Sequence, residues 1–333
     1  MMNVIATPHR PAIGTAGIIC APLFHIGGAG SAVAGLYNGQ HTILHRVFDP
    51  LKILDDMETY PVTSIFMVPA MIMAVLQIPE IEKRDFSRLE TMFYGASPIS
   101  ETVLRRAIEV FQCEFVQMYG MTETTGTVVN LTPDDHRRAL AGKPELLRSC
   151  GRPSVGVEIR IMDTDGREVD TDEVGEIWVK SDTNMLCYYN LPDATAANLT
   201  DGWIHTGDAG YMDGEGYLYL KDRIKDMVVS GGENIYPVEV ENALAKLEAV
   251  ADVAVIGVPN DKFGEALLAF VVTKPGMRLT VEEMMDFCRD KIAGYKIPRQ
   301  LEIVDELPRN PSGKILKKVL REPYWNDVDR GIG

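Results

Sequence analysis

The sequence has 333 residues, of which 46% are hydrophobic and 24% are charged, and its formal net charge at pH 7 is −15. These fractions are typical of a folded protein with a buried core, and they exclude an intrinsically disordered chain. The acidic balance argues against general nucleic-acid binding, which needs a basic surface. A chain of this length predicts about two domains.

The sequence contains no run of about 18 apolar residues, the length that spans a bilayer, so we expect no transmembrane segment. It also lacks a signal-peptide pattern, because His9-Arg10-Pro11 interrupts the short apolar run at the N-terminus. No CxxC pair occurs, which argues against a disulfide framework or a zinc site. We therefore expect a cytoplasmic protein with reduced thiols at its five cysteines: Cys20, Cys113, Cys150, Cys187 and Cys288.

Short apolar runs alternate with helical patterns over the first 150 residues. The runs at 17–21, 63–68 and 91–94 predict buried strands, and the patterns at 50–60, 69–77 and 100–111 predict helices. Ser100 followed by Glu101 is typical of a helix start. This alternation predicts a layered α/β sheet.

The character of the sequence changes near Gly151 and again near Arg223. Between them, strands predicted at 157–162 and 175–180, separated by turn signals, indicate a small β-rich subdomain. After Arg223, strands and helices predict a compact α+β unit. Its strands are expected at 227–229, 253–258, 266–273 and near 303, and its helices at 237–246 and 280–291.

Three polar segments carry residues suited to nucleotide chemistry, although each also has a purely structural interpretation. Thr122 and Glu123, in a Gly-bounded run of hydroxyls, could hold a phosphate and Mg²⁺, or form a structural turn. Asp208 could bind a ribose diol or cap a turn, and Arg223 lies in an alternating charge cluster typical of a protein surface.

Two further segments are flexible loops. Gly231 and Gly232, between a predicted strand and a predicted helix, could approach a phosphate, or form a plain tight turn. Lys314 follows the loop Pro308–Gly313 and could reach a developing negative charge.

Taken in order, five segments resemble the acyl-adenylate-forming superfamily, which includes acyl- and aryl-CoA synthetases, luciferases and the adenylation domains of peptide synthetases. The resemblance extends over nearly the whole chain, and the part at 201–225 is most similar to fatty acyl-CoA synthetases. The five segments lie at 22–28, 119–126, 201–208, 222–241 and 308–322.

The resemblance implies an α/β fold of the acyl-CoA synthetase type. Residues 1–222 are expected to be the C-terminal portion of a large AMP-binding domain, with a β-barrel-like subdomain at about 151–222. Residues 223–226 are expected to be a hinge, and 227–333 a small α+β C-terminal lid domain.

The resemblance also implies roles for individual residues of the large domain. The segment Gly95-Ala96-Ser97 is expected to lie against adenine, with Tyr119 stacking nearby. Thr122 is expected to contact the AMP phosphate, and Glu123 to bind Mg²⁺. His25 is expected near the acyl pocket or the thiol tunnel.

Other expected roles fall at the end of the large domain and in the lid. Asp208 and Arg223 are expected to bind the ribose hydroxyls, and Lys314 to reach the α-phosphate and the substrate carboxylate. Lys225 occupies the hinge position. The pair Gly231-Gly232 is expected to let pantetheine pass.

The implied activity is that of an AMP-forming acid–CoA ligase that uses ATP, Mg²⁺ and CoA. Its acid is expected to be fatty or aryl, because Met71 and Met73 near the expected pocket are adaptable apolar residues. Two alternatives stay open. The chain could be a non-catalytic fragment that holds AMP or acyl-AMP, or an adenylation domain that loads a carrier protein, although no carrier segment follows Lys314.

One family feature is missing from the sequence. Members carry, ahead of the segment that matches 22–28, a Ser/Thr/Gly-rich loop that grips the β- and γ-phosphates, and we find no such loop. We therefore expect slow or absent adenylation. We also expect exposed apolar surface that favours aggregation, a homo-oligomer or a partner covering the missing region.

Overall fold

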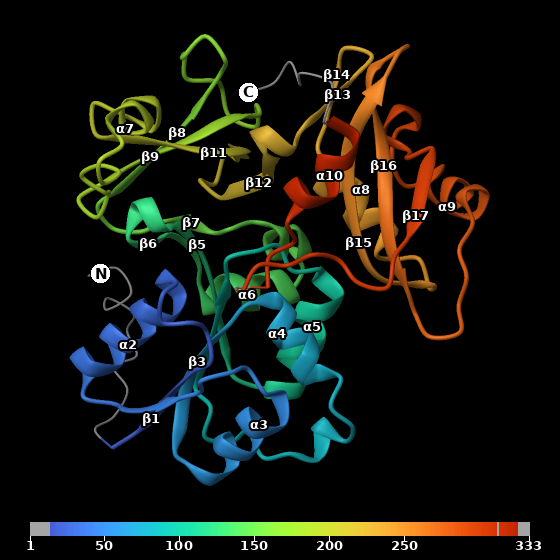
Figure 1. Ribbon diagram of the computed structural model, residues 1–333. Coiled ribbons are helices and arrows are strands. Elements are labelled where there is room, and N and C mark those ends of the chain that lie inside the picture. Colours follow the sequence, from blue (N-terminus) through green and yellow to red (C-terminus); the bar gives the residue numbers. More distant parts are fainter. Residues whose placement is uncertain (1–13, 312, 326–333) are drawn as a thin grey trace. The chain divides into compact units, whose positions relative to one another are not determined.

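The computed structural model describes residues 14–311 and 313–325. The chain divides into two compact units (Figure 1). The first contains the residues up to Thr206 together with Gly210–Leu220. The second contains Gly207–Ala209 together with the residues from Lys221 on.

A seven-stranded sheet organises the first unit, in the order β2-β1-β3-β4-β5-β6-β7. The five strands from β2 to β5 pair in parallel, and β6 and β7 are antiparallel. Helices connect the parallel strands, which confirms the predicted layered α/β architecture. The strands are β1 (Ala16–Ile19), β2 (His41–Leu44), β3 (Val62–Met67), β4 (Thr91–Gly95), β5 (Glu114–Met121), β6 (Gly126–Leu131) and β7 (Arg152–Pro153).

The helices of this unit begin at well-defined caps. Asp49 caps α3 (Pro50–Thr59) and Ser100 caps α5 (Glu101–Phe111), where its hydroxyl accepts a bond from the Val103 amide at 3.3 Å. Thr132 and Asp135 form a reciprocal capping box at α6 (Pro133–Leu140). The predicted start at Ser100 is confirmed, as are the helices predicted at 50–60 and 69–77, the second of which is α4 (Pro69–Leu76).

Helix α2 (Ile26–Asn38) contains the glycine cluster from Gly27 to Gly35, a composition that favours close packing of a helix. The structure agrees at Gly28, where a Cβ would lie 2.3 Å from the Pro22 carbonyl oxygen. The helix ends at Gly39, whose φ of 67° is the left-handed conformation that terminates many helices.

The β-rich region contains the second sheet, which has five strands. Their order is β10-β11-β9-β8, with β12 paired to β11. The strands predicted at 157–162 and 175–180 are present. However, the segment at 201–208, expected as a polar turn, lies largely in β11. Both Gly207, which has a φ of 67°, and Asp208 lie within this strand. The elements are β8 (Val157–Met162), β9 (Gly175–Ser181), α7 (Pro192–Asn198), β10 (Leu199–Thr200), β11 (Trp203–Met212) and β12 (Leu218–Arg223).

The second unit is built on a third sheet, in the order β14-β13-β16-β15, with β17 parallel to β16. Alternate residues of β15 and β16 enter two separate cores, as the two-residue period of a strand requires. Val255 packs with α8 and α9, whereas Ile256 packs on the face that α10 covers. The elements are β13 (Val228–Ser230), β14 (Glu233–Ile235), α8 (Pro237–Leu244), β15 (Val250–Asn260), β16 (Gly264–Thr273), α9 (Val281–Cys288), β17 (Gln300–Ile303) and α10 (Lys317–Trp325).

A buried ion pair fastens α10 to α8 within this unit. Lys317 Nζ lies 2.8 Å from Glu241 Oε1, and the two side chains are only 12% and 16% exposed. Burial alone would lower the pKa of Lys317, but Glu241 and Asp222 outweigh it and hold the pKa above its usual value. Lys317 therefore stays charged in the fold.

Replacing Lys317 with alanine should destabilise the second unit by about 3–5 kcal/mol, because it leaves the Glu241 carboxylate buried without its cation. Hydrogen exchange of the β15 and β16 amides measures this loss in the unit itself. The neighbouring Lys318, which is exposed, provides the matched control Lys318→Ala. Equal protection in the two variants would contradict the stabilising role of the pair.

Candidate functional site

The turn between β5 and β6 carries Thr122 and Glu123. Gly120 and Gly126 bring the two strands unusually close, since a Cβ on Gly120 would lie 1.8 Å from the Gly126 carbonyl oxygen. Between them, Thr122–Thr124 forms one short 3₁₀ turn, η2. The backbone at this turn therefore requires glycine at these two positions.

The three polar side chains of η2 do different things. Thr124 is 1% exposed, and its hydroxyl donates to the Gly126 carbonyl and accepts from the Met121 amide. It fixes the turn. Thr122 is exposed and Glu123 is half-buried, so these two side chains are the ones that a ligand could reach.

Glu123 is held by a segment that the sequence analysis did not identify. The Tyr188 hydroxyl donates to Glu123 Oε1 at 2.7 Å, and the Met185 amide donates to the Glu123 carbonyl at 2.6 Å. Burial, followed by the bond to Glu123, raises the pKa of Tyr188 to about 12. No spacing rule connects Tyr188 to Glu123, because 65 residues separate them.

The donor set at η2 fits Mg²⁺. Among the described residues, no cluster of three or more His, Cys, Asp or Glu side chains forms a protein cage for a metal. Mg²⁺ does not need one, because it is commonly bound by one or two carboxylates together with waters and substrate phosphates. Glu123, with the Thr122 hydroxyl beside it, supplies that kind of ligand.

The segment expected at adenine follows β4. Gly95 is required by the sheet itself, since a Cβ there would lie 2.1 Å from the Met118 carbonyl oxygen of β5. Ala96 has a φ of 68° and is exposed, and Ser97 is half-buried. The Tyr119 side chain is only 9% exposed and packs in the apolar core of the β-rich region.

His25 lies at the start of α2, where its Nδ1 accepts a bond from the Gly27 amide at 3.2 Å. The side chain thus caps the helix. Of the two methionines near the expected acyl pocket, Met71 is 8% exposed and packs in the core, while Met73 is 38% exposed.

Three charged residues expected at the nucleotide gather in the second unit. Arg223 Nε lies 3.2 Å from Asp208 Oδ1, and the Asp208 side chain is 13% exposed. Lys314 is close enough to both to sense their charges. Its pKa lies below the usual value, because partial burial and the positive charge of Arg223 disfavour its ammonium, which Asp208 and Asp226 favour.

The loop that presents Lys314 is shaped by Asn310. The Asn310 side-chain oxygen accepts a hydrogen bond from the Lys314 backbone amide at 2.9 Å. The Asn310 backbone amide donates to the Lys314 carbonyl at 2.9 Å. Arg309 adds a bond to the Gly313 carbonyl at 2.6 Å. These bonds fix the backbone of Lys314.

The expected hinge and glycine loop also lie in the second unit. Lys225 is exposed and sits in a 3₁₀ turn, η4 (Ile224–Asp226), where its carbonyl accepts from Arg321 of α10 at 3.0 Å. Gly231 and Gly232 form the two-residue connection between β13 and β14, with φ of 62° and 87°. Both positive values match a type I′ hairpin turn, which strongly favours glycine.

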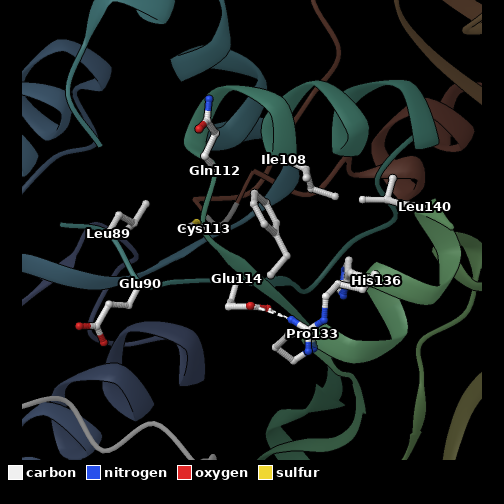
Figure 2. A pocket seen from close by; sticks show the side chains of 11 residues that line it. Leu89, Glu90, Ile108, Gln112, Cys113, Glu114, Pro133, His136 and Leu140 are labelled. Carbon is white, nitrogen blue, oxygen red and sulfur yellow. Dashed lines mark hydrogen bonds and ion pairs between the residues drawn. The ribbon is translucent and has the colours of Figure 1, made fainter. Parts of the chain in front are cut away.

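A pocket of about 640 Å³ lies elsewhere in the first unit, between α5, α6 and the start of β5 (Figure 2). Three of its polar side chains already have partners within the fold. Arg137 pairs with Glu114 at 2.7 Å, and His136 bonds Tyr94 at 2.9 Å, while burial lowers the His136 pKa to about 4. None of the residues expected at the nucleotide lines this pocket.

Comparison with known proteins settles the family. A family model described as AMP-binding enzyme matches residues 3–189, which is more than half of the chain, and a second, described as AMP-binding enzyme C-terminal domain, matches 239–314. The chain belongs to the AMP-binding enzyme family. This confirms the resemblance inferred from the five segments.

Several AMP-binding enzymes are similar over nearly all of this chain. A fatty acid–acyl-carrier-protein ligase from Streptomyces coeruleorubidus is 40% identical over 320 residues, covering 96% of the chain and 61% of the relative. A medium/long-chain-fatty-acid–CoA ligase from Mycobacterium tuberculosis is 36% identical, with 95% and 55% covered. The chain therefore spans about 60% of the length of such relatives.

Solved structures agree with the fold. The o-succinylbenzoate coenzyme A synthetase from Bacillus subtilis, in complex with ATP and magnesium ion, matches with a TM-score of 0.82 and 34% identity over 92% of this chain and 62% of its own. The match confirms the predicted α/β fold of the acyl-CoA synthetase type. In the described part of the chain, no helix has the length and apolar character needed to cross a bilayer.

Proposed function

We propose that this AMP-binding enzyme is an AMP-forming acid–thiol ligase. It activates a fatty or aryl carboxylic acid with ATP to an acyl-AMP and then transfers the acyl group to CoA. The observation that carries the proposal is the grouping of Asp208, Arg223 and Lys314 in one unit, with opposite charges arranged around an accessible lysine. Such a group suits a ribose diol and the phosphate attached to it.

The residues take these roles in the proposal. The Asp208 carboxylate accepts bonds from the ribose hydroxyls, and Arg223 holds that carboxylate in place while contacting the same sugar. Gly95-Ala96-Ser97 lies along adenine, with Tyr119 behind it. Thr122 donates its hydroxyl to the AMP phosphate.

The first half-reaction joins the acid to the nucleotide. An oxygen of the substrate carboxylate attacks the α-phosphorus of ATP, and the bond to pyrophosphate breaks. Bound at Glu123, Mg²⁺ would neutralise phosphate charge. Lys314 donates to the α-phosphate oxygens, where negative charge develops, and a positioned cation of this kind lowers the barrier.

The second half-reaction forms the thioester. The thiolate of CoA attacks the acyl carbon, and the bond to AMP breaks, so AMP leaves as the product. In the proposal, the part of the chain that follows Lys225 turns about this residue between the two half-reactions, which withdraws Lys314 and brings Gly231-Gly232 to the pantetheine arm. The exposed hairpin turn suits that role, because it presents backbone without side chains.

A carrier protein is the second candidate acceptor. It is favoured by the 40% identity to a ligase that loads an acyl carrier protein. Both acceptors end in the same pantetheine thiol, so they are distinguished by the partner and not by the chemistry. A third candidate is binding of AMP or acyl-AMP without turnover.

The test supplies synthetic acyl-AMP with either CoA or a phosphopantetheinylated carrier protein. Thioester on CoA supports the proposal, and thioester on the carrier alone selects the second candidate. Retained AMP binding with no thioester on either acceptor identifies the third.

The lowered pKa of Lys314 predicts the pH dependence of adenylation. A lysine loses its charge as the pH rises through its pKa, so the rate should fall at a midpoint below 10.5, the usual value for lysine. Lys314→Arg, which stays charged over this range, should lack that decline. Acid-dependent pyrophosphate exchange measured against pH tests this. The same alkaline decline in both proteins would show that another group titrates.

A further inference from the structure

The Glu123 carboxylate is held by one hydroxyl from a distant part of the first unit. Tyr188 donates to Glu123 Oε1 at 2.7 Å. Among the described residues, the second oxygen, Oε2, accepts no protein hydrogen bond, so it is the atom that remains to contact a ligand. The bond from Tyr188 therefore sets the direction in which Oε2 faces.

The backbone of the same turn is held independently. The Met185 amide donates to the Glu123 carbonyl at 2.6 Å, and the Thr125 hydroxyl donates to the Thr183 carbonyl at 2.6 Å. These two bonds join the segment after β9 to η2 without the Tyr188 side chain. Loss of the phenol hydroxyl thus leaves the turn in place and frees only the carboxylate.

Tyr188 is itself anchored. Its amide donates to Thr195 Oγ1 at 2.9 Å, and that hydroxyl donates to the Leu191 carbonyl at 2.9 Å, in the first turn of α7. The segment that carries the phenol is thus tied to the first turn of α7 by a hydrogen bond. An anchored donor can fix a carboxylate in one orientation, which is what a metal ligand requires.

We propose that Tyr188 is a positioning residue that orients the Glu123 carboxylate toward the metal-bound nucleotide. The proposal rests on the proposed function, because it needs Glu123 to hold Mg²⁺. Hydrogen-bond partners that orient a metal ligand typically change metal affinity by about 10–100-fold when removed. Tyr188 belongs to this class of partner, although it touches neither the metal nor the substrate.

The test measures metal binding and not turnover. Mn²⁺ replaces Mg²⁺, and its affinity is titrated by electron paramagnetic resonance in the presence of α,β-methylene-ATP. Tyr188→Phe removes only the hydroxyl and should weaken Mn²⁺ binding about tenfold, with the melting temperature unchanged. The adjacent Tyr189, which is 87% exposed, gives the control Tyr189→Phe, for which Mn²⁺ affinity should equal that of the unmodified protein.

A double-mutant cycle shows whether the hydroxyl acts through the carboxylate. Tyr188→Phe added to Glu123→Gln should weaken Mn²⁺ binding no further than Glu123→Gln alone. Unchanged Mn²⁺ affinity in Tyr188→Phe, while Glu123→Gln weakens it, would overturn the positioning role only. No effect of Glu123→Gln would overturn the proposed function of Glu123 as well.

Discussion

Replacing Lys314 with alanine is expected to slow acyl-AMP formation by about 10²–10³-fold, the loss typical when one charge-stabilising donor is removed. Lys314 lies near Asp208 and Arg223, and those two side chains pair with each other at 3.2 Å. Thioester formation from ready-made acyl-AMP should keep its rate, because the proposed rotation withdraws Lys314 before that step. Pyrophosphate exchange and thioester formation measure the two half-reactions separately.

The matched control for this variant is Lys318→Ala, which removes an exposed lysine in the first turn of α10. It should leave both half-reactions at their original rates. An equal loss in the two half-reactions of Lys314→Ala would contradict the account, because one conformation would then serve both.

Replacing Lys225 with proline is expected to have the opposite effect: adenylation persists, and transfer of the acyl group falls about 10²-fold, equivalent to about 2.7 kcal/mol in the barrier. Proline fixes φ near −65°, a value that a 3₁₀ turn such as η4 already uses. A large change in φ at this position is not compatible with proline. Single-turnover transfer from acyl-AMP to CoA measures the loss.

Lys225→Ala is the control for this prediction, since it removes the same side chain and leaves the backbone free. It should transfer the acyl group at nearly the original rate. Normal transfer in Lys225→Pro would show that residue 225 does not change conformation, and the hinge proposal would fail. Reduced transfer in both variants would instead assign the effect to the lost ammonium.

The sequence predicted the elements whose local pattern of apolar residues and caps matches the side chains that the fold buries. Strand β3 has a continuous apolar run, and α5 has both an amphipathic pattern and the Ser100 cap. The bounds of helix α2 do not follow from its glycines, which are poor helix formers, and the close approach to the Pro22 carbonyl appears only in the packed chain. The position of Asp208 within a strand was not predicted, because that strand is completed by pairing between distant segments.

The candidate site shows the same division. The motifs containing Thr122, Glu123 and Lys314 were found from their residue types and their resemblance to a family. Tyr188 was not found, because its contact with Glu123 depends on how the segment after β9 folds back on η2. The bond between Arg321 and the Lys225 carbonyl is likewise a consequence of the packing of α10.

The central claim is that the residues of this chain hold an acyl-AMP and pass its acyl group to a thiol. The most direct measurement is thioester formation by the purified 333-residue protein, with CoA and Mg²⁺, supplied once with synthetic acyl-AMP and once with ATP plus acid. The account predicts thioester and free AMP from acyl-AMP, and product from ATP plus acid would extend it to the complete reaction. Acyl-AMP that stays intact in the presence of CoA and a carrier protein would contradict it.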